Sequence, residues 1–153
     1  MSILLLQSCS DSKQEVAKRL PALNLYSGYF YKIIKKAIRE NDLRADMDLR
    51  ILSAEHGLLH PDTEILHYDR KMDTERAKQL QDDVVSELRE LINEEGYNRV
   101  IVNMAKEYRT AIQGFDDELD VKVDYVCGDG IGYKGHVLKR VVRGDDSAFT
   151  VSS

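Results

Sequence analysis

The first residues that could do chemistry follow a short apolar run near the amino terminus. Residues 3–6 have the length and composition of a buried strand, and they lead directly into a small polar loop. The loop consists of Ser8, Cys9, Ser10, Asp11, Ser12 and Lys13. Ligands of parallel α/β sheets bind in such loops, beyond the carboxyl ends of the strands. Hydroxyls, backbone N–H groups and the Lys13 ammonium could hold an anion or the polar edge of a base. The alternative is a surface loop whose serines cap a helix.

A second set of candidates lies in residues 54–69, a loop of a length that usually indicates function or disorder. Disorder of this loop is disfavoured because its apolar residues Leu58, Leu59, Ile65 and Leu66 must pack against other parts of the chain. Asp69 is the first candidate for orienting water or stabilising positive charge, and Asp11 is the second. The alternative for each carboxylate is to cap a helix or a loop. His56 could stabilise a leaving group, and its alternative is a structural role.

Other polar groups follow the later strands. Asn103 ends a third apolar run and could supply a polar contact. The glycine-rich turn 127–135 matches neither a dinucleotide fingerprint nor a P-loop, so no cofactor is predicted. The spacing of His60, Asp62 and His67 is not that of a metal site, so no metal is predicted either.

The elements that must position these residues alternate along the chain. Strands are predicted at 3–6, 49–53, 99–103 and 121–126, and helices at 14–19, 28–40, 73–95 (closed by Gly96), 106–113 and 137–142. The alternation predicts one α/β domain over residues 1–153, frayed from about residue 144. We expect a three-layer α/β/α sandwich with a mostly parallel sheet of about four strands. The polar loops all follow strands and are therefore expected to converge on one edge of the sheet.

Charge is distributed unevenly along the chain. The formal net charge is -5, yet the helix predicted at 28–40 carries a basic face of Lys32, Lys35, Lys36 and Arg39. This face could contact phosphates, and the alternative is an ordinary solvated surface. No apolar run is long enough to cross a membrane and no secretory signal is present, so a cytoplasmic location is expected.

Several motifs taken together resemble a known family. They are Ser8-Cys9-Ser10 with Lys13, Pro21-Ala22, Leu25-Tyr26-Ser27-Gly28 with Phe30, Ile51-Leu52-Ser53-Ala54-Glu55-His56-Gly57-Leu58-Leu59, Pro61-Asp62, Ile65 and Tyr68-Asp69. Over about the first half of the chain, these residues resemble DUF6884, a family of bacterial, archaeal and phage proteins of unknown function. That family is similar in fold to the glycosylase-like domain of archaeosine synthases and to uracil-DNA-glycosylase-type proteins. Glu55 departs from the family pattern, in which this position is usually basic.

The resemblance implies that the protein handles a nucleobase, including modified ones. Hydrolysis of an N-glycosidic bond needs a group that orients water, donors for the departing base and a pocket for the extruded nucleotide. We therefore expect a glycosylase-like enzyme that leaves an abasic site, with nucleic acid (DNA ahead of RNA) bound through helix 28–40. The alternatives are a non-catalytic sensor of a nucleotide or modified base, and a free-nucleotide hydrolase or transferase. The expected catalytic residues are Asp69, Asp11 and His56, and the expected binding residues are Ser8, Cys9, Ser10, Lys13, Tyr26, Ser27, Gly28, Tyr68 and Asn103.

Overall fold

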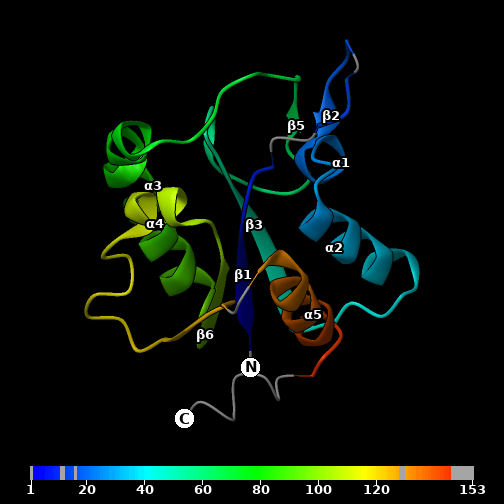
Figure 1. Cartoon of the computed structure of the whole chain (residues 1–153). Helices are drawn as coiled ribbons and strands as arrows, with labels where there is room; N and C mark the ends of the chain where they lie inside the picture. The colour runs from blue at the N-terminus through cyan, green and yellow to red at the C-terminus, as the bar shows by residue number, and fades with distance from the viewer. Residues whose placement is uncertain (1, 11–12, 16, 128–129, 146–153) are drawn as a thin grey trace.

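The computed structural model describes residues 2–10, 13–15, 17–127 and 130–145 as a mixed α/β fold (Figure 1). The strands are β1 (Ile3–Ser8), β2 (Leu20–Pro21), β3 (Met47–Ser53), β4 (Gly57–Leu59), β5 (Glu64–Ile65), β6 (Arg99–Asn103) and β7 (Lys122–Tyr125). The helices are α1 (Ala22–Leu25), α2 (Tyr29–Arg39), α3 (Thr74–Glu95), α4 (Lys106–Ile112) and α5 (Ile131–Val142). In these ranges, every helix is too short or too polar to span a membrane.

The main sheet has five strands in the order β4-β3-β1-β6-β7. Strands β3, β1, β6 and β7 are parallel, which confirms the mostly parallel sheet expected from the sequence. The strand of this sheet that was not predicted is β4, which turns back against β3 and pairs Gly57 with Ser53. This tight turn requires a positive φ of 76° at Gly57, a conformation that glycine adopts at little cost.

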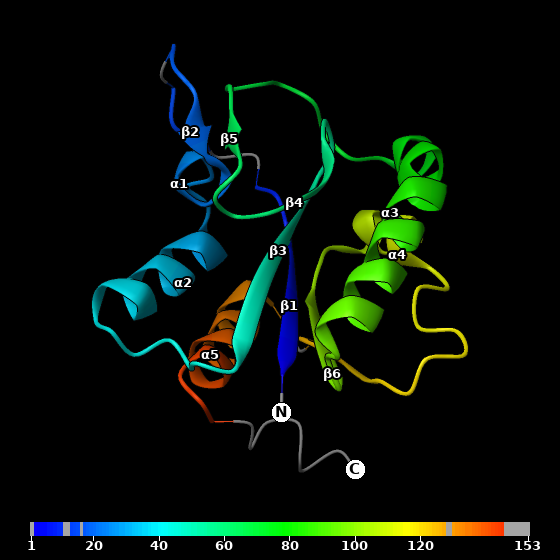
Figure 2. The ribbon, with the colours of Figure 1, turned by 180° about the vertical axis from the view of Figure 1, so that it is seen from behind.

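Helices cover both faces of this sheet (Figures 1 and 2). Strand β1 lies at its centre, and all six of its residues are buried. Leu4 and Leu6 pack with residues of α3 and α4, whereas Ile3 and Leu5 pack with residues of α2 and α5. A strand that is buried on both faces has no solvent side, and its sequence is therefore apolar without interruption until Gln7.

The longest helix, α3, begins one residue after the predicted start at residue 73 and ends at the predicted residue 95. The Asp73 side chain accepts a hydrogen bond from the Arg76 backbone N–H (2.7 Å), and Gly96 ends the helix in the left-handed conformation. These caps satisfy backbone groups that have no partner inside the helix. The apolar face is buried at Ala77, Val84, Leu88 and Ile92.

The helix predicted at 14–19 is not formed in the described residues of that segment. Instead, Lys13 pairs with Tyr26 in an antiparallel bridge, and the Gln14 N–H donates to the Leu25 carbonyl (2.7 Å). The backbone at Lys13 and Gln14 is thus paired with the carboxyl end of α1 and the residue that follows it. This pairing holds the end of the first polar loop against the segment that connects α1 to α2.

The exposed face of α3 contains a cluster of acids that should make stability depend on pH. Burial and the carboxylates of Asp83 and Glu90 raise the pKa of Glu87 above its ordinary value. The charged form of Glu87 is therefore less favourable in the folded than in the unfolded chain, and it destabilises the fold above its pKa. We expect Glu87→Gln to raise the free energy of unfolding by about 0.5 kcal/mol at neutral pH.

This gain should disappear as the pH falls through the raised pKa, because Glu87 is then protonated and neutral. Urea unfolding at neutral and acidic pH measures it, with Glu75→Gln at the exposed start of α3 as the control. Glu75 interacts favourably with the amino end of the helix, so its substitution should lower stability slightly. A Glu87→Gln gain that is the same at both pH values would contradict this explanation.

Candidate functional site

A cavity of about 500 Å³ opens at the carboxyl ends of β1 and β6. Residues 7–10 form its floor, and residues 103–105, 107 and 108 continue from β6 along one side. The first residues of α2 and α5 supply the opposite wall, and Lys71 and Met72 reach in from the segment before α3. We call this the central pocket. Segments far apart in the sequence thus converge at the edge of the sheet where polar loops were expected.

The floor of the central pocket contains a buried pair of amides. Gln7 is 1% exposed and Asn103 is 3% exposed, and they lie in register on neighbouring strands. The Asn103 Nδ2 group donates to Gln7 Oε1 (2.8 Å). A buried amide is unfavourable unless it is hydrogen-bonded, so each residue stabilises the other. The pair places carboxamide groups at the base of the cavity.

The other β1 residues of the floor are fixed from neighbouring helices. The Tyr31 hydroxyl donates to the Ser8 carbonyl (2.8 Å), and burial raises the pKa of Tyr31 well above its ordinary value. The Cys9 Sγ and Tyr108 Oη atoms are 2.9 Å apart. Ser8 and Cys9 are nearly buried, and Cys9 is not part of a disulfide. The tyrosine contacts hold this polar segment rigidly between α2 and α4.

Two glycines allow close approaches that shape the pocket wall. A Cβ atom on Gly28 would lie 2.6 Å from the Ser10 Cβ, and the Gly28 N–H donates to Ser10 Oγ (3.3 Å). A Cβ atom on Gly135 would lie 2.4 Å from the Tyr29 hydroxyl and ring edge. The Tyr29 ring, which lines the pocket, can therefore rest on α5 only because residue 135 has no side chain.

The Gly135→Ala variant is therefore expected to displace the Tyr29 ring. Alanine favours helix over glycine by about 1 kcal/mol, but the new methyl group overlaps the far end of the exposed Tyr29 side chain, and moving this ring aside should offset part of that gain. Gly132→Ala in the same helix meets no atom within 4 Å and should stabilise the chain by about 0.5–1 kcal/mol. Urea unfolding compares the two variants, and the NMR signals of Tyr29 report its position. Equal stabilisation by both would contradict the packing described here.

Charged groups also line the central pocket. They are Glu107, Lys71 and Lys134. Helices α2 and α5 begin at the wall with Gly28 and Gly130 as their caps, and neither cap uses a side chain. The amino ends of helices favour negative or electron-rich groups. The cavity therefore combines a polar floor, apolar and aromatic walls and a rim with charges of both signs.

A smaller pocket of about 280 Å³ is lined by Lys13, Asp69, Arg70 and Lys71. We call it the basic pocket. Lys71 lines both pockets, so the two adjoin one another. The Lys13 Nζ atom lies 4.6 Å from the centre of the Tyr68 ring, a distance typical of a cation–π contact. Three cations and one carboxylate thus gather beside the mouth of the central pocket.

A hydroxyl network fixes the Tyr68 ring. The Tyr68 Oη atom lies 2.7 Å from Tyr26 Oη and 2.9 Å from Ser53 Oγ, and Ser53 Oγ accepts from the N–H groups of Glu55 and His56. Burial raises the pKa of Tyr26 to about 12 and that of Tyr68 further still, so both phenols are neutral at physiological pH. The network therefore stays protonated and connected.

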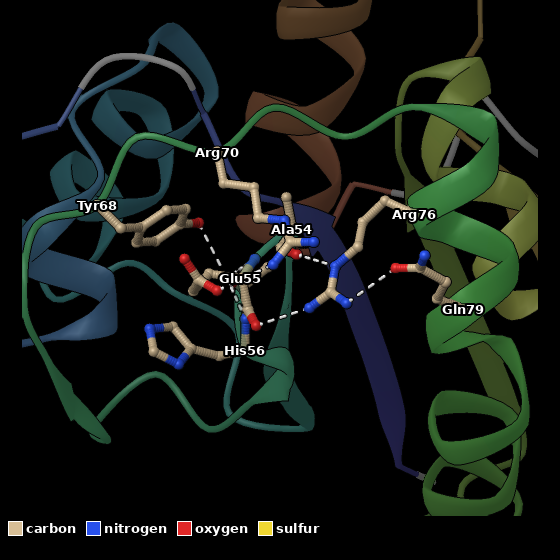
Figure 3. Close-up of polar contacts among 8 residues, drawn as sticks. Ala54, Glu55, His56, Tyr68, Arg70, Arg76 and Gln79 are labelled. Carbon is tan, nitrogen blue, oxygen red and sulfur yellow. Dashed lines mark hydrogen bonds and ion pairs between the residues drawn. The ribbon is translucent and has the colours of Figure 1, made fainter.

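The turn after β3 is also held by an arginine of α3 (Figure 3). The Arg76 guanidinium donates to the carbonyls of Ala54 (2.7 Å) and Glu55 (3.0 Å). Arg70 donates to the Glu55 carboxylate (3.2 Å) from the other side. Glu55 thus anchors the loop and contributes no side chain to either pocket.

The structure distributes the residues proposed from the sequence among several places. Ser8, Cys9, Ser10, Gly28 and Asn103 line the central pocket, and Lys13 and Asp69 line the basic pocket. Half-buried Ser27 lines neither of them. Exposed His56 packs its ring edgewise on half-buried Tyr68, outside both pockets. Asp11 lies outside the described residues.

Tyr26 was expected among the binding residues, and the structure corrects this for its ring. It is 0% exposed, and its ring packs between Tyr31 and Tyr68. A base cannot reach either face, so its contribution is the hydroxyl bond to Tyr68. The aromatic residues that do line the central pocket are Tyr29, Phe30, Tyr31 and Tyr108.

The sequence interpretation did not select Gln7, Lys71, Glu107, Tyr108 or Lys134. Gln7 had a local signal, because it is the one amide in an otherwise apolar strand. The others line the pocket through tertiary placement and had none. Within the described ranges, no three His, Cys, Asp or Glu side chains are grouped as a metal ion would require.

Comparison with known proteins gives the family but no activity. The chain is similar to a crystal structure described as AF0587, a protein of unknown function, with 14% sequence identity and a TM-score of 0.52. The match covers 93% of this chain and 45% of that one, so the chain spans less than half of that structure. No curated protein matches. The model of a family of unknown function, DUF6884, matches residues 4–140, and the chain therefore belongs to the DUF6884 family.

Proposed function

We propose that the central pocket binds a nucleobase and that the protein is a glycosylase-type hydrolase of a modified base in DNA or RNA. The observation that carries the proposal is the buried Gln7–Asn103 pair at the floor of a cavity with aromatic walls. The proposal places the pocket between the helix layers of a three-layer α/β/α sandwich.

A carboxamide offers two donors and one acceptor. One donor of Asn103 is used by Gln7, and one donor of Gln7 is used by the Ser8 carbonyl (3.3 Å). The groups that remain match the donor and acceptor pattern of a base edge, which asparagine and glutamine read in nucleic acids. The rings of Tyr29, Phe30 and Tyr108 supply apolar surface for the faces of the base. A volume of about 500 Å³ is in the range of small-ligand sites.

Hydrolysis would add water to the anomeric carbon of the sugar, and the electrons of the broken bond would pass to the base nitrogen, which takes a proton. A carboxylate could orient this water and stabilise the cationic sugar. Glu107 lines the central pocket and Asp69 lies in the basic pocket next to it. Asp11 stays a candidate from the sequence. In this proposal, Asn103 rather than His56 contacts the departing base.

The basic face of α2 is the proposed contact for the nucleic-acid strand. Lys32, Lys36 and Arg39 are exposed, whereas the Lys35 ammonium donates to the Tyr26 carbonyl (2.6 Å). Burial lowers the pKa of Lys35, in keeping with a structural position. The first turn of α2 lines the pocket, so a strand along this helix would bring a base to its mouth.

The experiment is to incubate the protein with a panel of modified phage DNAs and tRNAs and to measure released bases by mass spectrometry. We expect release of a free base and an abasic site in the polymer. Glu107→Gln and Asp69→Asn should each be tested, and loss of the carboxylate that orients water should slow release about 100-fold. Glu94→Gln, at an exposed position on α3, is the matched control. Absence of release from the whole panel would overturn the enzymatic proposal.

A second candidate is a non-catalytic sensor of a modified base. It is favoured because Glu107 is the one carboxylate among the described residues that line the central pocket, and it is exposed. A sensor would bind the same bases without turnover. Its binding would be unaffected by Glu107→Gln and Asp69→Asn.

A further inference from the structure

We propose that the basic pocket is a phosphate subsite, so that the ligand of this protein is a nucleotide unit rather than a bare base or a nucleoside. The inference rests on the proposed function for the base, and it concerns Lys13, Arg70 and Lys71, which that function has not used. The phosphate would belong to a free nucleotide or to a nucleic-acid strand.

The first step is position. Lys71 lines both pockets, which makes them neighbours at the same edge of the sheet. A base in the central pocket would leave its sugar at the mouth, and the next group along the nucleotide is a phosphate. The basic pocket, which shares Lys71 with the central pocket, could receive this group.

The second step is charge. Lys13, Arg70 and Lys71 surround the basic pocket with three positive charges, against the carboxylate of Asp69 in the pocket and that of Glu55, which pairs with Arg70 (3.2 Å). Among the described residues, Asp69 forms no ion pair within 4 Å. Phosphate is the common ligand of such groups of lysine and arginine, since lysine acts as a point charge and arginine as a planar donor.

The third step is rigidity. Lys13 is held by its backbone bridge to Tyr26 and by the cation–π contact with Tyr68. The Arg70 guanidinium is held by Glu55, and Glu55 is fixed in turn by the Arg76 bond to its carbonyl (Figure 3). Two of the three cations are therefore ordered before a ligand arrives, which reduces the entropy lost on binding. An ordinary surface cluster of lysines has no such supports.

The test uses a probe without bases, a short fluorescent single strand made entirely of abasic units, together with inorganic phosphate. The double variant Arg70→Gln/Lys71→Gln removes two exposed cations. Lys78→Gln/Lys122→Gln removes the same charge from exposed positions on α3 and β7 and is the matched control. Circular dichroism melting confirms that both variants are folded.

We expect the first double variant to bind the abasic strand about tenfold more weakly at low salt, and the control to bind like the parent chain. The slope of log affinity against log salt should fall by about 1.4 for the loss of two phosphate contacts. If Arg70→Gln/Lys71→Gln weakens binding of the abasic strand, the phosphate belongs to a polymer. If it weakens only the binding of inorganic phosphate, followed by NMR, the phosphate belongs to a free nucleotide. If both double variants lose affinity for the probes equally, the subsite proposal is wrong. It is also wrong if neither double variant loses affinity for the abasic strand or for inorganic phosphate.

Because the probes carry no base, this result is independent of base release. If the protein releases bases, but Arg70→Gln/Lys71→Gln binds each probe as tightly as the control double variant, the proposed function is retained and the phosphate subsite is wrong. A chain that releases no base but loses phosphate binding through Arg70 and Lys71 would retain the subsite alone.

Discussion

Asn103→Leu is expected to remove nucleobase binding and to destabilise the fold at the same time. Leucine has nearly the shape of asparagine but cannot donate to Gln7, which would leave the Gln7 carboxamide oxygen buried without its partner. Such a loss lowers the free energy of unfolding by about 1–3 kcal/mol. Base binding should weaken about 10- to 100-fold, because the same side chain provides the proposed contacts with the base edge. Urea unfolding measures the first effect, and NMR titration with free bases and mononucleotides measures the second.

A double variant separates the two effects. In Gln7→Met/Asn103→Leu both amides become apolar groups of similar shape, so no buried group lacks a partner and much of the stability should return. Binding should stay lost, since no carboxamide remains at the pocket floor. Asn93→Leu, on the exposed side of α3, controls for the substitution itself. If the double variant recovers binding together with stability, the amides are structural and the proposed base contact is wrong.

Much of the sheet and of the longest helix could be predicted because their signals are local. Strand β1 is buried on both faces and is therefore apolar over several consecutive residues, which a sequence shows directly. Helix α3 has its Asp73 cap, its apolar stripe and its Gly96 stop within one segment. In contrast, β4 is three residues long and is defined by its pairing with β3. No pattern within residues 57–59 could indicate that partner.

The residues of the candidate site likewise divide into those that the sequence could predict and those that it could not. Ser8 and Asn103 were selected because they end predicted strands, and the carboxyl ends of parallel strands meet at one edge. Tyr26 was selected as a binding residue within the motif Leu25-Tyr26-Ser27-Gly28, but its neighbours in the chain do not determine which way the ring points. The bridge between Lys13 and Tyr26 and the contact with Tyr31 turn it inward. Lys71 enters the pocket from a segment with no regular structure, which no periodicity could place.

Ser53→Ala is expected to have the largest effect on stability of the substitutions outside the central pocket. Ser53 is 0% exposed at the end of β3, where its hydroxyl accepts from two backbone N–H groups and bonds to the Tyr68 hydroxyl. Alanine removes all three bonds and should lower the free energy of unfolding by about 2–3 kcal/mol. Ser86→Ala on the exposed side of α3 loses no buried partner and should be neutral or slightly stabilising. Urea unfolding of the two variants makes the comparison.

A double-mutant cycle with Tyr68→Phe tests whether the hydroxyl network acts as a unit. Phenylalanine keeps the ring beneath Lys13 but cannot bond to Ser53 or Tyr26, and should cost about 1 kcal/mol. Because the Ser53–Tyr68 bond is lost in either single variant, the double variant should cost less than the sum of the two, by about 0.5–1 kcal/mol. Strict additivity would contradict a shared bond. The same cycle bears on the phosphate subsite, since Tyr68→Phe should leave abasic-strand binding nearly unchanged, whereas Ser53→Ala should weaken it by releasing the ring that supports Lys13.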